Sequence, residues 1–196
     1  MVVDPGEERI KNEFTGVKCT MLPMHSILRI DEVKKQGVSK VSDFEGTNVS
    51  EGRGTTRPFE LIGAPWVIAE RFAEAMNRRD LPGVYFRPAV FEPTFQKHAG
   101  IACAGVQPHV LDRQTFRAVE AGVALIEAFR ASDPNQFRWK DPPYEYEFEK
   151  MPIDCLAGSS TLREQIDGGV AAHEIAASWT DPVAVFKRAR ANYLLY

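Results

Sequence analysis

The sequence predicts a single α+β domain in which a small mixed or antiparallel sheet is accompanied by about four helices. Two observations predict this fold class. Short segments rich in Val and aromatic residues, several interrupted by proline, are mixed with segments of helical period, and their order is not the strict βαβ alternation of a parallel sheet. The length of 196 residues, 44% of them hydrophobic, suits one sizeable core with a small appendage. We therefore divide the chain into a poorly organised segment, 1–43, and a domain, 44–196.

The first half of the domain predicts one helix among three extended segments. FELIGAPW (59–66) is a short apolar run that ends in proline, which is typical of a strand followed by a turn. The helix that follows has apolar residues at helical spacing: Ala69, Phe72, Ala73 and Met76. VYFRPAVFEPTF (84–95) and GVQPHVLD (105–112) are extended and edge-like, because proline cannot donate to a sheet ladder.

The second half predicts three helices and one strand. Asp112 is the predicted N-cap of a long amphipathic helix that ends near SDPN (132–135). YEYEFE (144–149) alternates aromatic and acidic residues, which favours an antiparallel strand with one wet face. Hydroxyl residues at 159–161 cap a short helix. TDP at 180–182 begins a terminal helix, after which the last aromatic and leucine residues pack back on the core.

Composition excludes several function classes. The formal net charge of −3 gives no reason to expect nucleic acid or an anionic membrane as a partner. No apolar run reaches the ~20 residues that span a bilayer, and the first residues are too acidic for a signal peptide. Cys19, Cys103 and Cys155 lack metal-ligand spacing and are expected to be reduced, so we predict neither a metal nor a cofactor.

The polar stretch EGTNVSEGRGTTRPFE (45–60) is the strongest candidate for a site. It is not a phosphate-binding loop, because it matches neither GxxxxGK[ST] nor GxGxxG and because Pro58 lacks the N–H that such a loop needs. Its amide and hydroxyl groups suit sugar hydroxyls, and a guanidinium suits a carboxylate. The same residue types also form ordinary turns. The candidate ligand contacts are Asn48, Ser50, Arg53, Thr55 and Glu60.

Two weaker groups of candidates accompany this loop. Four glutamates offer the pair of carboxylates that glycosidic acid/base chemistry requires, although sequence spacing does not give their separation: Glu45, Glu51, Glu60 and Glu92. His98 and His109 flank Cys103, but the spacing matches no metal signature, so each is interpreted as a structural or substrate-contacting histidine.

From EGTNVSEGRGTTRPFELIGAPW onward, the chain resembles the carboxy-terminal half of the NamZ-type exo-β-N-acetylmuramidases. The likeness continues through LPGVYFRP, FEPTFQKHAGIACAGVQPHVLDR, AGVALIEAFR, PPYEYE, PIDCLAGSSTLREQI and YLLY, and covers about residues 44–196. The resemblance implies release of N-acetylmuramic acid from the non-reducing end of peptidoglycan-derived glycans. It also implies that residues 48–59 form one wall of a cleft, with Glu45, His98, Gln107 and His109 nearby. Arg53 is then expected to bind the lactyl carboxylate.

The same resemblance implies a departure from the family pattern. Members of the family carry an amino-terminal Rossmann-like domain before this point, and the expected catalytic acid belongs to that domain, so no catalytic residue is assigned here. Residues 1–43 read as a remnant of the preceding region. Two alternatives follow: a muramidase that needs this domain from a partner or associates with its own copies, or a non-catalytic carbohydrate-binding or subunit-type domain. Full-length members are often exported, whereas this sequence shows no leader.

Overall fold

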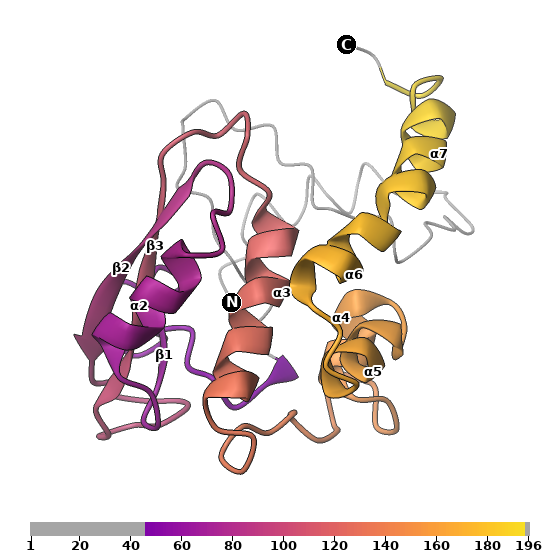
Figure 1. Cartoon of the computed structure of the whole chain (residues 1–196). Coiled ribbons are helices and arrows are strands. Elements are labelled where there is room, and N and C mark those ends of the chain that lie inside the picture. The colour runs from indigo at the N-terminus through magenta and orange to yellow at the C-terminus, as the bar shows by residue number, and fades with distance from the viewer. Residues whose placement is uncertain (1–45, 195–196) are drawn as a thin grey trace, which may run out of the picture. The chain divides into compact units, whose positions relative to one another are not determined.

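The computed structural model describes residues 46–194 of a chain that divides into two units, Met1–Glu32 and Val33–Tyr196. All the described residues belong to the second unit, and the predicted α+β fold is confirmed there (Figure 1). The elements are β1 (Ile62–Ala64), α2 (Ala69–Asn77), β2 (Val84–Phe91), β3 (Cys103–Val110), α3 (Ala118–Ser132), α4 (Pro152–Ala157), α5 (Thr161–Asp167), α6 (Ala172–Ser178) and α7 (Thr180–Arg190). The described part thus has six helices rather than about four, because α4 and α6 are short helices that the sequence did not predict.

The sheet is antiparallel, with strand order β1-β3-β2. β2 is an edge strand, as its proline predicted, whereas β3 is central despite Pro108. The hydrogen bonds explain how β3 accommodates that proline. The N–H and C=O of Phe86, the residue opposite Pro108, bond to the side chain of Asn77 at 2.9 and 2.8 Å and therefore point away from β3. The nitrogen of Pro108 accordingly points away from β2, towards the β1 side, where the β1–β3 register ends two residues before Pro108, with Ile62 opposite Val106.

The core lies between one face of this sheet and the helices α2 and α3. Helix α2 buries the four residues whose spacing predicted it, Ala69, Phe72, Ala73 and Met76. Helix α3 is buried on most sides, because its middle is built from small and aliphatic residues, and Phe129 packs against Phe72 with ring centroids 4.2 Å apart. Figure 1 shows α3 between the sheet with α2 and the group α4 to α6. The strands of this packed sheet therefore fix where the neighbouring loops begin and end.

Three expectations for the second half of the domain are wrong. Helix α3 begins at Ala118 rather than after Asp112, because the Asp112 carboxylate closes a separate turn by accepting the Gln114 N–H at 2.9 Å and the Thr115 hydroxyl at 2.8 Å. Residues 180–190 form the terminal helix, α7, that the sequence predicted to begin at TDP.

The second error concerns YEYEFE, which forms a tight turn rather than a strand. Tyr144 and Glu147 exchange backbone hydrogen bonds of 2.8 and 2.9 Å, and Glu145 between them has a positive φ of 54°. The Glu147 carboxylate accepts the N–H groups of the two residues after Phe148, which ends any extended course. Tyr146 is 95% exposed and Phe148 71% exposed. The alternation has no neighbouring strand to pair with among the described residues.

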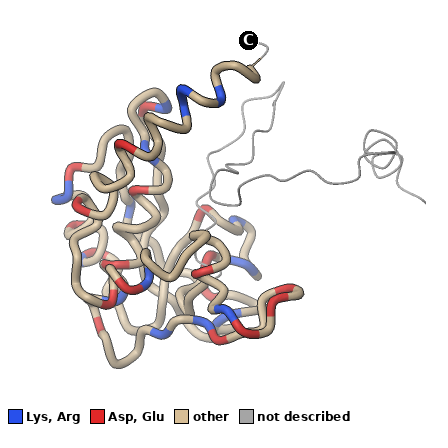
Figure 2. Tube along the Cα trace, turned by 90° about the vertical axis from the view of Figure 1, so that its right-hand side faces the viewer, with Lys and Arg blue, Asp and Glu red and all other residues tan. Residues whose placement is uncertain are grey.

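The third error concerns the end of the chain. Helix α7 runs away from the core beyond α6, and none of its residues is buried (Figure 1). Tyr193 and Leu194 are exposed as well, so the expected return to the core is absent from the described residues. Charges of both signs are spread along the described trace, and the last turn of α7 is basic through Lys187, Arg188 and Arg190 (Figure 2). No helix in residues 46–194 has the length and apolar character needed to cross a bilayer.

Candidate functional site

The polar stretch folds as an ordered loop whose hydroxyl groups hold its own backbone. Ser50 is buried, and its Oγ accepts the N–H of Gly52 at 3.2 Å. Thr55 donates its hydroxyl to the carbonyl of Gly52 at 2.6 Å and accepts the N–H of Arg57 at 3.1 Å. Gly52 and Gly54 have φ of 73° and 82°, a region that favours glycine. Ser50 and Thr55 therefore shape the loop by turn chemistry, the alternative to ligand contact that the sequence left open.

Asn48 attaches the start of the loop to the segment after α3. Its amide donates from Nδ2 to the carbonyl of Gln136 at 2.8 Å, and its Oδ1 accepts the N–H of Arg138 at 2.9 Å. The backbone N–H of Asn48 donates to the carbonyl of Arg138 at 3.0 Å. The side chain predicted to contact a ligand is thus used by the protein itself.

A buried carboxylate lies at the centre of the loop. The side chain of Glu51 is only 4% exposed, and each of its oxygens meets a cation: Arg53 Nε at 2.9 Å from Oε1, and Lys97 Nζ at 2.8 Å from Oε2. The Arg53 contact is an ion pair rather than a hydrogen bond, because the Nε–H is not directed at that oxygen. The guanidinium also lies over the ring of Phe59, with Cζ 4.9 Å from the ring centroid.

The neighbouring loop, 92–101, is attached at three points to the loop 46–60 that carries Glu51. Lys97 Nζ donates to the carbonyl of Val49 at 3.1 Å in addition to its bond with Glu51. Thr94 donates its N–H and its hydroxyl to the carbonyl of Gly54, both at 2.9 Å. His98 Nε2 lies 2.7 Å from the carbonyl of Asn48. The two loops therefore form one continuous polar wall.

Burial and neighbouring charges shift two pKa values at this wall. Burial lowers the pKa of Lys97, while the Glu51 carboxylate opposes that shift, and Lys140 and Arg53 add to it. Burial also raises the pKa of Tyr144, as does the nearby Glu145, and Arg53 acts in the opposite direction. The turn that carries Tyr144 thus contributes to the same electrostatic surroundings as Arg53.

Backbone strain is concentrated in the loops of this wall. Five described residues other than glycine have a positive φ, and three of them lie in the two loops of the wall: Phe59, Gln96 and His98. His98 has φ of 58° and also packs edge-on against Trp66, with ring centroids 6.0 Å apart. Strained residues are retained where the surrounding structure holds a functional arrangement, so their position supports a site here.

A second polar group lies on the sheet face opposite the core. Gln107 of β3 is buried, accepts the Arg87 guanidinium at 2.6 Å, and donates to Glu60 Oε2 at 3.5 Å. Glu60 also accepts Arg57 Nη1 at 3.2 Å. His109, two residues further along β3, is exposed and pairs in register with Tyr85.

The structure therefore brings the predicted residues together in two groups. Asn48, Ser50, Arg53, Thr55 and His98 belong to the wall around Glu51, and Glu60 and Gln107 form the group on β3. His109 lies apart from both, at the end of β3, and Glu45 lies outside the described residues. Sequence reasoning missed Lys97 and Arg87. The available signal for Lys97 was its place beside His98 in the same motif.

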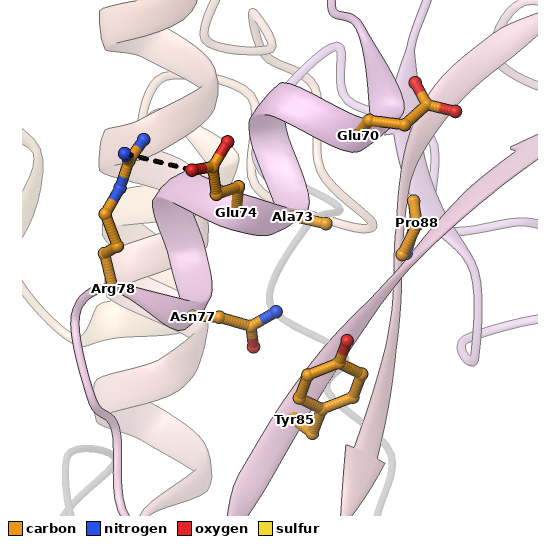
Figure 3. A pocket seen from close by; sticks show the side chains of 7 residues that line it. All are labelled: Glu70, Ala73, Glu74, Asn77, Arg78, Tyr85 and Pro88. Atoms are coloured by element: carbon orange, nitrogen blue, oxygen red, sulfur yellow. Dashed lines mark hydrogen bonds and ion pairs between the residues drawn. The ribbon is translucent and has the colours of Figure 1, made fainter.

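Other features of the described residues do not add to these groups. A shallow open pocket of about 490 Å³ lies between α2 and β2 (Figure 3), and none of the eight predicted residues that the structure describes lines it: its lining is Glu70, Ala73, Glu74, Asn77, Arg78, Tyr85 and Pro88. Residues 46–194 contain no cluster of three or more His, Cys, Asp or Glu side chains that would hold a metal. Cys103 is buried and Cys155 half-buried, and both are free thiols.

Two family models match the chain. The model described as the carboxy-terminal domain of the exo-β-N-acetylmuramidase NamZ matches residues 40–196, which is most of the chain. A domain of unknown function, DUF1820, matches residues 1–52. The two matches overlap at residues 40–52, at the start of the polar loop.

Comparison with individual proteins also finds a NamZ relative, together with two solved structures of similar fold. The peptidoglycan β-N-acetylmuramidase NamZ of Bacillus subtilis (strain 168) is 41% identical over 153 residues, which cover 78% of this chain but 35% of that protein. Crystal structures of two DUF1343-family proteins from Bacteroides fragilis share the fold. The first is 27% identical with a TM-score of 0.65, and the match covers 76% of this chain and 38% of that protein. The second is 28% identical with a TM-score of 0.52, and the match covers 80% of this chain and 39% of that protein. The chain thus spans about a third of the length of the relatives it matches.

Proposed function

The chain belongs to the family of the carboxy-terminal domain of the exo-β-N-acetylmuramidase NamZ, and we propose on this basis that its described domain binds peptidoglycan-derived amino sugars. The wall formed by the loops 46–60 and 92–101 is the proposed binding surface. The observation that carries the proposal is the ion cluster at its centre. Two cations, Arg53 and Lys97, face one carboxylate, Glu51, and the Arg53 side chain is the more exposed of the two cations. Such a surface favours a sugar that bears a carboxylate.

Within this wall, Arg53 is the proposed partner of that carboxylate. Its side chain is 33% exposed, whereas those of Glu51 and Lys97 are 4% and 21% exposed. A guanidinium presents N–H donors in a fork that matches a carboxylate. N-acetylmuramic acid has a lactyl carboxylate and N-acetylglucosamine has none, so Arg53 would distinguish the two sugars.

Hydrolysis of the β-glycosidic bond is proposed for the family reaction, with catalytic groups from outside residues 46–194. Acid/base chemistry needs a carboxylic acid and a second carboxylate on opposite sides of the bond. Both oxygens of Glu51 are occupied by cations, and Glu60 accepts from Arg57 and Gln107. A chain that binds the sugar without cutting it is the alternative that these occupied carboxylates favour.

The Arg53→Ala variant tests the proposal. Binding of N-acetylmuramic acid and of N-acetylglucosamine is measured by calorimetry or ligand-observed NMR. A hydrogen bond to a charged group contributes about 1.5–3 kcal/mol, so affinity for the muramic acid should fall by about 10- to 150-fold, with little change for N-acetylglucosamine. Arg78→Ala on α2 removes an arginine from another exposed ion pair, with Glu74, and should change neither affinity. Equal loss for both sugars would contradict the assignment.

A chromogenic β-glycoside of N-acetylmuramic acid separates the enzyme from the binding domain. Turnover by the full chain that disappears in Glu60→Gln or Glu45→Gln would favour an enzyme active by itself. Binding of the glycoside without turnover would favour the carbohydrate-binding domain.

A further inference from the structure

We propose that Tyr146 and Phe148, in the turn 144–148, form a stacking surface for the pyranose ring of the sugar that the wall binds. This inference rests on the proposed function and adds a contact to that site. The proposed carboxylate partner distinguishes sugars by their charge, whereas the two aromatic rings contact the part of the sugar that is uncharged. The segment 144–149 is the one whose alternating sequence predicted a strand and formed a turn instead.

The two rings are exposed to an unusual extent for large apolar side chains. Tyr146 is 95% exposed and Phe148 is 71% exposed, whereas Tyr144 at the start of the same turn is half-buried. Folding gains little from either exposed ring, because most of its apolar surface stays in water. Large apolar side chains that are exposed together on one short segment are typical of a surface that contacts another molecule.

The backbone of the turn holds the two rings in a fixed arrangement. Tyr144 and Glu147 exchange backbone hydrogen bonds of 2.8 and 2.9 Å, which close the turn around Tyr146. The Glu147 carboxylate also accepts the N–H groups of the two residues after Phe148, at 2.9 and 3.3 Å. A contact surface that is already ordered loses less conformational entropy when a ligand binds. The turn is therefore suited to present aromatic rings to a ligand.

The segment that carries this turn is attached to the wall at both of its ends. At one end, the N–H of Lys140 donates to the carbonyl of Gly46 at 2.9 Å. At the other end, Ile153 packs so closely against Gly46 that a Cβ at position 46 would lie 2.7 Å from Ile153 Cβ. Gly46 is the first described residue of the loop 46–60. Residues 141–152 therefore leave the wall and return to it at the same point.

The charges of the turn indicate which part of a sugar it contacts. Glu145, Glu147 and Glu149 alternate with the two aromatic residues, and like charges repel a ligand's carboxylate. Burial raises the pKa of Tyr144 and Arg53 opposes that shift, so the turn lies within electrostatic reach of the cationic part of the wall. The C–H groups of a pyranose ring pack against the negatively polarised face of an aromatic ring. N-acetylmuramic acid and N-acetylglucosamine both have such a ring.

Single substitutions of the two aromatic residues test the stacking surface. Tyr146→Ala and Phe148→Ala should each weaken binding of N-acetylmuramic acid and of N-acetylglucosamine by the same factor, about two- to tenfold. Tyr146→Phe keeps the aromatic ring, so both affinities should stay within about twofold of the wild type. Tyr193→Ala removes a side chain that is 84% exposed beyond α7 and should change neither affinity. The Kd values are measured by calorimetry or ligand-observed NMR on the full chain.

Urea unfolding separates a ligand contact from a structural role. Because Tyr146 and Phe148 are strongly exposed, the alanine variants should have the urea midpoint of the wild type. A loss of affinity at an unchanged midpoint then reports the contact with the sugar. A lowered midpoint together with the loss of affinity would show that the rings support the turn, and would overturn the inference.

Failure of the inference and failure of the proposed function give different results. If the wild-type chain binds neither sugar, the proposed function is wrong and the inference falls with it. If the wild-type chain binds the sugars and the alanine variants bind them equally well, only the inference is overturned, and the exposed rings belong to a contact with another protein. A loss confined to N-acetylmuramic acid would also overturn it, because the turn would then recognise the lactyl group rather than the ring.

Discussion

Replacement of Asn48 by Ala tests whether this residue belongs to the scaffold or to the ligand surface. The side chain makes two hydrogen bonds, from Nδ2 to the carbonyl of Gln136 and to Oδ1 from the N–H of Arg138, at 2.8 and 2.9 Å. Each such bond contributes about 1 kcal/mol net, so the free energy of unfolding should fall by about 2 kcal/mol. For a chain of this size, that loss lowers Tm by about 4–8 °C. The assay is thermal and urea unfolding followed by circular dichroism.

Asn135→Ala is the matched control. Asn135 is exposed and lies in the same connection after α3. Its backbone N–H bonds to the Asp133 carboxylate, but its side-chain amide makes no hydrogen bond with the described residues. Its stability should stay within about 0.5 kcal/mol of the wild type. If Asn48→Ala is as stable as this control but binds N-acetylmuramic acid more weakly, the side chain contacts the ligand and its scaffold role is refuted. The backbone bond from Asn48 to Arg138 remains in the variant, so the loop is weakened rather than detached.

Two further predictions concern protonation. His98 Nε2 lies 2.7 Å from the Asn48 carbonyl, which only accepts, so ¹⁵N NMR should show that neutral His98 carries its proton on Nε2; a proton on Nδ1 would contradict this geometry. Burial raises the pKa of the Cys103 thiol from 9.0 to about 11, so the folded state keeps a proton that the unfolded state loses. The stabilisation is present below pH 9 and is lost as the pH rises through 11, and the total loss is about 2.7 kcal/mol. Cys103→Ser should not show this loss in urea titrations, and an equal alkaline loss in both proteins would refute the prediction.

Local patterns predicted the helices and strands that are amphipathic by themselves. The four apolar positions of α2 are the residues that it buries, and the proline of β2 indicated an edge strand. The pattern in YEYEFE failed because an alternating segment becomes a strand only when another strand is beside it. Pro108 wrongly indicated an edge strand for a related reason. A proline can stand in the central strand β3 only because β1 ends before it reaches that position.

The sequence predicted which segment carries the candidate site, but it did not predict how the side chains of that segment are arranged. Loop composition located the wall, yet it did not reveal which side chains the protein uses for itself. The bonds of Asn48 join residues 88 and 90 positions apart, and Lys97 meets Glu51 across 46 positions. Sequence spacing carries no information on such contacts without a known fold. The role of Glu51 as the centre of the wall therefore emerged only from the structure.

The amide of Asn77 has a consequence for how this domain meets other proteins. By occupying the N–H and C=O of Phe86, it fills the outward-facing hydrogen-bonding site in the middle of β2, and Pro88 at the next such position offers no donor. On the opposite edge, Gly63 of β1 exchanges both its groups with Ser50. An incoming strand from another chain would find the ladder interrupted in the middle of β2 and at Gly63 of β1. These interruptions disfavour growth of the sheet from molecule to molecule, and they favour neighbours that attach through side-chain surfaces.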